Sequence, residues 1–151
     1  LYGTVDAALC CLDGINYLPA LSEVADVFRR VHLFLEPGGI FIFDINTPYK
    51  LKNLDDQLFL DEKEGVYCVW RAKYDEDERA CFYGIDIFSR EGKLWRRDFE
   101  EHVEYAYSPD ELKEALESAG FSDVNIYGEL SLEPPCEEEN RIFITARKMK
   151  Q

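Results

Sequence analysis

The sequence has little positive charge. Its 17 lysine and arginine residues face 31 aspartate and glutamate residues, which leaves a formal net charge of −14 at pH 7. A protein of this charge repels a polyphosphate backbone, so we expect no nucleic-acid partner. No apolar run approaches the roughly 20 residues that are needed to span a bilayer. The N-terminus also lacks the basic segment followed by an apolar segment that is typical of a signal peptide. We therefore expect a cytoplasmic chain with no membrane partner.

Cysteine pairing motifs are missing as well. The five cysteines form no C-x-x-C pair, and an odd number cannot all pair within one chain. This favours reduced thiols over a disulfide framework, and it predicts no metal site. At 151 residues with 46% hydrophobic residues, the chain is long enough for one domain with a core.

What the sequence does contain begins with a strand-helix-strand pattern. The apolar run from Val5 to Leu12 is typical of a strand covered on both faces. Apolar residues then recur at helical spacing from Leu21 to Leu35, and we expect Pro37-Gly38-Gly39 to end this helix. A second apolar strand follows at 40–45. The pattern predicts a right-handed crossover that joins two parallel strands.

In the middle of the chain, the spacing of apolar residues changes from that of a helix to that of a strand. Residues 48–65 are expected to be a connection with a short helix around 54–60. Alternating side chains then predict three antiparallel strands within 66–107, at 66–74, 80–89 and 94–107. The tight turns between them indicate an inserted three-stranded β-meander.

The last part of the chain starts with a strong helix signal. Ser108-Pro-Asp-Glu111 has the residues of a capping box with proline at the first helical position, and Gly120 is the expected left-handed stop. Strands at 123–129 and 141–147, separated by an acidic proline-containing loop, are expected to pair as a hairpin.

Two motifs in this order resemble a known family. They are Leu35-Glu-Pro-Gly-Gly-Ile-Phe-Ile-Phe-Asp44, and Tyr107-Ser-Pro-Asp-Glu-Leu112 followed by Ala119-Gly-Phe121. The chain resembles the C-terminal half of a class I, Rossmann-like S-adenosylmethionine-dependent methyltransferase of the small-molecule type. The resemblance implies an α/β fold with the equivalents of strands 4 to 7, a closing antiparallel hairpin and the inserted meander, all in one truncated domain over residues 1–151.

The resemblance also implies that part of the cofactor site lies outside this sequence. In the family, a Gly-rich loop after the first strand and an acidic residue after the second bind S-adenosylmethionine. Here the paired glycines, Gly38 and Gly39, lie between helix and strand rather than between strand and helix. We expect full cofactor binding to need the upstream half. We also expect residues 5–12 to form an exposed edge that pairs with a second copy, giving a homodimer.

The carboxyl ends of the two parallel strands carry the first candidate site residues. By resemblance, Cys11, Leu12 and Asp13 pass close to the cofactor, mostly through backbone atoms. Asn16 is a candidate for substrate binding and Tyr17 for catalysis, because ligands of such sheets bind at this edge. The alternative is that Asp13 and Asn16 only shape a turn.

One strand over, Asp44 and Asn46 occupy the same edge and are candidates for substrate binding. For Asp44, capping of the Asn46-Thr47-Pro48 turn is the alternative. Tyr49, just before the meander, is a further substrate-binding candidate.

The meander at 66–107 stands where many members of the family carry a lid over the acceptor. Trp70, Arg97 and Tyr105 are its substrate-binding candidates, although an aromatic strand residue such as Trp70 is also typical of a sheet core. His102 is a candidate catalytic base or a structural histidine. Glu101 and His102 are adjacent in a strand and should face opposite sides, which argues against a dyad between them.

Two functions follow from these features. The first is methyl transfer from S-adenosylmethionine to a small-molecule acceptor, with this chain as the acceptor-side half and inactive alone. The second is a non-enzymatic, self-associating interaction module. An NAD-dependent dehydrogenase fits less well, because the insertion and the closing hairpin suit the methyltransferase order better.

Overall fold

The computed structural model describes residues 3–150, which form two compact units. The first unit comprises the residues up to Lys50 together with those from Ala106 onward, and the second comprises Leu51–Tyr105. No helix among the described residues is long and apolar enough to cross a membrane.

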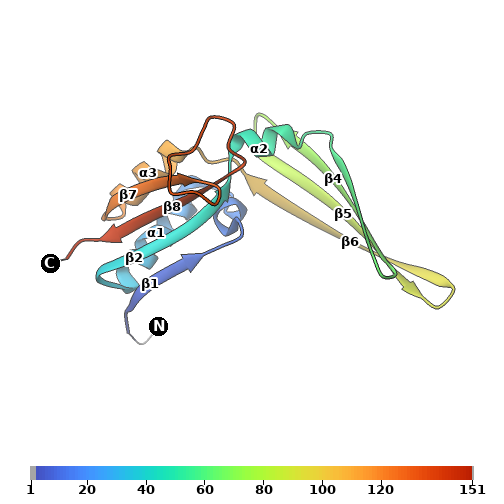
Figure 1. The fold of residues 1–151 in the computed structure, drawn as a ribbon, viewed down its shortest axis with the longest axis horizontal. Helices are drawn as coiled ribbons and strands as arrows, with labels where there is room; N and C mark the ends of the chain where they lie inside the picture. The colour runs from blue at the N-terminus through green and yellow to red at the C-terminus, as the bar shows by residue number, and fades with distance from the viewer. Residues whose placement is uncertain (1–2, 151) are drawn as a thin grey trace. The chain divides into compact units, whose positions relative to one another are not determined.

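The first unit is built on a four-stranded sheet in the order β1-β2-β8-β7 (Figure 1). Strand β1 (Val5–Cys10) is parallel to β2 (Leu35–Asn46), as predicted, and α1 (Leu21–Phe34) connects them after a short 3-10 helix, η1 (Gly14–Tyr17). Strand β8 (Arg141–Lys148) is antiparallel to both β2 and β7 (Phe121–Gly128), which confirms the predicted hairpin.

The core of this unit lies between the sheet and its helices. Figure 1 shows α1 and α3 (Pro109–Ser118) on one side of the sheet. Phe28 of α1 is fully buried, with its ring centroid 5.9 Å from that of Phe41 and 5.3 Å from that of Phe43 on β2. Leu112 and Leu116 of α3 are also fully buried. The alternation of side chains along β2 therefore turns its phenylalanines toward the helices.

The start of α3 confirms the capping box. The Ser108 hydroxyl accepts a hydrogen bond from the Glu111 amide, and the Glu111 carboxylate accepts one from the Ser108 amide. These bonds satisfy two amides that a helix start leaves without an intrahelical partner. At the other end Gly120 has φ +98°, the left-handed conformation expected of a helix stop.

The predicted break at Pro37-Gly38-Gly39 is wrong. Helix α1 already ends at Phe34, and β2 runs from Leu35 through these residues to Asn46. The pairing with β1 shifts register between Val5 and Ala7, and Gly38 has φ +87°. The glycines thus serve an irregularity within the strand, because glycine adopts positive φ without a Cβ clash.

The second unit is a four-stranded antiparallel sheet in the order β3-β4-β5-β6. Its strands are β3 (Leu58–Lys63), β4 (Val66–Asp75), β5 (Ala80–Glu91) and β6 (Leu94–Tyr105). The expected helix around 54–60 is wrong, because 58–63 pair with β4 and the nearby helix is α2 (Pro48–Asn53). The meander thus has four strands rather than three. Every residue of β3 is exposed, so the buried alternation that marks a strand is missing there.

His32 of α1 makes the first unit sensitive to acid. Its ring packs edge-on against Phe121, with the centroids 5.1 Å apart. Burial and the nearby Lys148 lower the pKa of His32 below its usual 6.5. The unfolded chain therefore binds a proton at higher pH than the folded chain does. This contribution to stability is complete above about pH 6.5 and is lost as the pH falls from the unfolded pKa to the lower folded pKa.

We expect urea denaturation between about pH 7.5 and pH 5.5 to show a loss of stability in the wild type that is smaller in a His32→Gln variant. A His102→Gln variant reports what the other histidine contributes. Parallel curves for the wild type and His32→Gln would contradict this account.

Candidate functional site

The carboxyl ends of β1 and β2 meet at a buried carboxylate. Asp44 is 2% exposed, and its two oxygens accept hydrogen bonds from the backbone amides of Leu12 (2.8 Å) and Asp13 (3.2 Å). The alternative that Asp44 caps the turn after Asn46 is wrong. In that turn the Thr47 hydroxyl accepts the hydrogen bond from the Lys50 amide at 3.1 Å. Asp44 instead holds the turn that follows β1.

The turn held by Asp44 has a strained backbone. Leu12 has φ +63° and Asp13 φ +52°, the left-handed region that side chains with a Cβ disfavour. Each such residue costs on the order of 1 to 2 kcal/mol unless its surroundings stabilise it. The two hydrogen bonds to Asp44 supply that stabilisation and keep Cys11, Leu12 and Asp13 in one conformation.

Arg141, the first residue of β8, completes this cluster. Its guanidinium forms an ion pair with Asp44 and a second one with Asp13, where Nη2 lies 2.9 Å from Oδ1. Burial alone would lower the pKa of Arg141, but Asp13 and Asp44 outweigh it and raise that pKa. The side chain of Arg141 is 19% exposed. One cation therefore pairs with both carboxylates at this edge, and the cluster keeps one net negative charge.

Asn16 and Asn46 join the same two segments a second time. The Asn16 amide nitrogen donates to the Asn46 carbonyl, and the Asn46 backbone N–H donates to the Asn16 side-chain oxygen, both at 3.0 Å. Asn16 is fully buried and Asn46 is 3% exposed. The Asn46 side-chain oxygen also accepts from Lys50 at 2.8 Å. The two residues meet as predicted, and they have a structural role; their contact with an acceptor remains a prediction.

Of the residues predicted to contact the cofactor, Cys11 and Leu12 are accessible. Cys11 is exposed, and the Leu12 side chain is 78% exposed although it is apolar. The amides of Leu12 and Asp13 are already bound by Asp44, so these amides are not offered to a ligand. Burial, followed by the charge of Asp44, raises the pKa of the neighbouring Cys10 thiol, which disfavours Cys10 as a nucleophile.

Two predicted tyrosines lie near this edge in the first unit. Tyr17 ends η1 and is 45% exposed. Tyr49 lines a cavity of about 270 Å³ together with Thr47, Cys136 and Glu137.

The candidates in the second unit divide between the two faces of its sheet. Strand alternation places Arg97 and Tyr105 on one face and His102 on the other; Trp70, paired with Ile85, shares the His102 face. The partner of His102 is Glu100, with Nε2 and Oε2 3.4 Å apart. Glu101 points to the opposite face, as the alternation predicted.

Arg97 binds a buried carboxylate of its own sheet. Its Nε donates to Asp86 at 2.6 Å, and Arg71 forms an ion pair with the other oxygen of Asp86. Burial would raise the pKa of Asp86, but Arg97 and Arg71 outweigh it and hold that pKa below its usual range. Trp70 is 40% exposed rather than a core residue.

Sequence reasoning missed Arg141, Asp86 and Glu100. Arg141 could have been found from the sequence. Two carboxylates were expected at one sheet edge and need a cation, and Arg141 is the first residue of the C-terminal strand predicted at 141–147. Asp86 and Glu100 carry no such signal, because their partners depend on which strands pair and in what register.

The fold is similar to solved structures of S-adenosylmethionine-dependent methyltransferases, as the resemblance predicted. A crystal structure of an S-adenosylmethionine-dependent methyltransferase from Clostridium acetobutylicum matches 99% of this chain and 60% of its own, with a TM-score of 0.89 and 27% identity. The structure of CalS10 from Micromonospora echinaspora, an amino pentose methyltransferase with bound S-adenosylmethionine, matches 98% of this chain and 60% of its own. Its TM-score is 0.77, and at 18% identity it supports the fold alone.

Sequence relatives agree with the structures. "Putative methyltransferase YqeM" of Bacillus subtilis is 28% identical over 149 residues, which is 98% of this chain. A protein of Geobacillus with the same description is 29% identical over 150 residues. The chain spans about 60% of the length of these relatives. No family model matches it.

Proposed function

We propose that this chain is the acceptor-side half of an S-adenosylmethionine-dependent methyltransferase that acts on a small molecule. One observation carries the proposal. The turn Cys11–Asp13 is held in a strained conformation at the carboxyl edge of a sheet whose solved counterparts are methyltransferases. Strain of this kind clusters at ligand-binding sites, where surrounding contacts maintain it.

The residues at this edge fit one side of a cofactor site. S-adenosylmethionine supplies a methyl group on a sulfonium, and transfer is an in-line displacement that depends on positioning and exclusion of water. An exposed apolar side chain at Leu12, on a backbone held by Asp44 and Arg141, offers a rigid surface for the cofactor's nucleoside. Tyr17 at the end of η1 is the proposed catalytic hydroxyl of this unit.

The second unit is proposed to select and activate the acceptor. Trp70, Arg97 and Tyr105 remain its predicted acceptor contacts. His102 remains the predicted base, and Glu100 would hold one ring tautomer of His102. The role of residues 66–107 as an acceptor lid remains a prediction.

Calorimetric titration with S-adenosylhomocysteine tests the proposed function. We expect binding by a protein in which this chain is extended to the full length of its relatives, and no measurable binding by the 151-residue chain alone. An extended protein that folds but does not bind the cofactor would overturn the proposal.

Self-association is a second candidate function, because β1 is an open edge. Among residues 3–150, β1 pairs only with β2, and Leu9 on it is 69% exposed. Unpaired backbone groups beside apolar side chains favour pairing with another strand. Sedimentation of the 151-residue chain should show a dimer that a Leu9→Lys substitution dissociates; a monomer at high concentration would exclude this candidate.

A further inference from the structure

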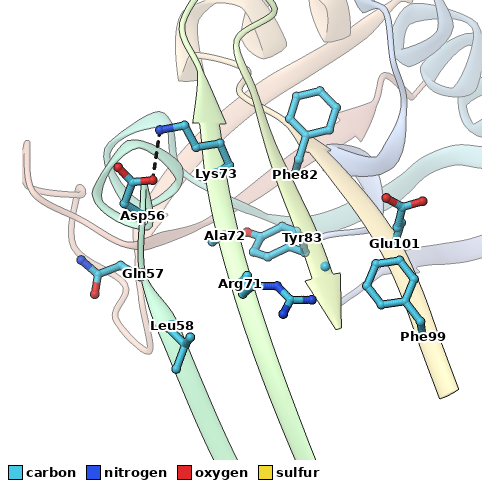
Figure 2. A pocket seen from close by; sticks show the side chains of 11 residues that line it. Asp56, Gln57, Leu58, Arg71, Ala72, Lys73, Phe82, Tyr83, Phe99 and Glu101 are labelled. Carbon is cyan, nitrogen blue, oxygen red and sulfur yellow. Dashed lines mark hydrogen bonds and ion pairs between the residues drawn. The ribbon is translucent and has the colours of Figure 1, made fainter. Parts of the chain in front are cut away.

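We infer that one face of the second unit carries a binding site for a small molecule with a protonated amine. This face is opposite to the one that carries His102, the predicted base, so the inference does not rest on the proposed methyl transfer. The site is a hollow of about 470 Å³ on the sheet, and the backbone of Gly84 lies in its floor, between Arg71 and Glu101. Figure 2 shows the side chains that line it.

Gly84 creates the hollow. It stands inside the long strand β5, in one row with Arg71 of β4 and Glu101 of β6. A glycine in a strand interior weakens the sheet and is typical of a place where another group approaches the backbone. A Cβ at Gly84 would lie 3.4 Å from the Phe99 ring, which is ordinary contact, so no steric conflict in this fold demands glycine.

Aromatic side chains stand on both sides of that row. Phe82 precedes Gly84 by two residues and shares its face, and Phe99 lines the hollow from β6 (Figure 2). Phe99 is 48% exposed, which is unusual for a side chain of this size. The Arg97 guanidinium already lies over the Phe99 ring, 5.9 Å from its centroid. The rings therefore offer a ligand an apolar packing surface.

Around the hollow, the cationic side chains are paired with carboxylates other than Glu101. Arg71 and Arg97 share Asp86, and Lys73 lies 3.1 Å from both Asp55 and Asp56. Glu101 makes no hydrogen bond or ion pair with any residue between 3 and 150. The cations of this face are thus already neutralised, while Glu101 is available.

Phenylalanine rings beside an available carboxylate define the ligand. An ammonium group would pair with Glu101, and the apolar body of the same molecule would pack on Phe82 and Phe99 over Gly84. A neutral analogue would lose the ion pair, and an anion would be repelled by Glu101.

Amide NMR of the 151-residue chain tests this site with benzylamine, which is protonated at neutral pH, and with its neutral analogue benzyl alcohol. We expect benzylamine to shift the amides of Gly84, Phe99 and Glu101, and benzyl alcohol to shift them far less at equal concentration. Glu101→Gln should weaken benzylamine binding about tenfold, the value of one charge-assisted hydrogen bond. Gly84→Val, which fills the floor, should also weaken it.

Asp98→Asn is the matched control, since it removes the same charge from the same strand on the opposite face. It should bind benzylamine as the wild type does. Equal binding of benzylamine and benzyl alcohol, or equal binding by wild type and Glu101→Gln, would overturn the site. If benzylamine binds as expected while the extended protein fails to bind S-adenosylhomocysteine, the site stands and the proposed methyl transfer fails.

Discussion

Replacing Arg141 with methionine should lower the free energy of unfolding of the first unit by about 3 to 5 kcal/mol. Methionine keeps most of the apolar stem but leaves Asp44, 2% exposed, as a buried carboxylate without its cation. Removing one partner of a buried ion pair is costly because the remaining charge stays desolvated. Urea denaturation at neutral pH measures the loss.

Arg147→Met is the control for this substitution. Arg147 is on the same strand, but its side chain is 51% exposed and lies 3.6 Å from Asp123. An exposed pair of this kind contributes about 1 kcal/mol at most. Equal losses for the two variants would show that the Asp13-Arg141-Asp44 cluster does not hold the turn.

Truncating Phe28 to alanine should also cost about 3 to 5 kcal/mol. Phe28 is fully buried against Phe41 and Phe43, so its removal leaves a cavity in addition to the lost apolar burial. Leu33→Ala on the same helix is the control, because Leu33 is 65% exposed and should change stability by less than about 0.5 kcal/mol.

Chemical denaturation followed by far-UV circular dichroism compares the two variants. A loss below about 1 kcal/mol for Phe28→Ala would mean that α1 is not fastened to the sheet through this side chain. The crossover that positions the turn after β1 would then need another explanation.

Local signals predicted most of the first unit. The apolar runs identify β1 and the end of β2, and the Ser108 capping box identifies α3, because each depends on neighbouring residues alone. The start of β2 was missed because proline and two glycines usually end an element, whereas here they form an irregular strand. Strand β3 was missed because its side chains are all exposed, which removes the alternation.

The sequence predicted at which edge of the sheet the candidate site lies. Asp13, Asn16, Asp44 and Asn46 were expected at one end of the sheet, and they meet there. What could not be read from the sequence is how they use their hydrogen bonds. Asp44 binds the amides of Leu12 and Asp13 rather than its own turn, and this choice depends on the geometry of two strands and on Arg141 from 97 residues further along.

Hydrogen–deuterium exchange of the extended protein, with and without S-adenosylhomocysteine, tests the central claim most directly. The claim is that the turn Cys11–Asp13 forms part of the cofactor site. We predict slower exchange in a peptide covering residues 9–17 when the cofactor product is bound, and little change in peptides of the hairpin β7-β8. Unchanged exchange in residues 9–17 at saturating S-adenosylhomocysteine would contradict the account.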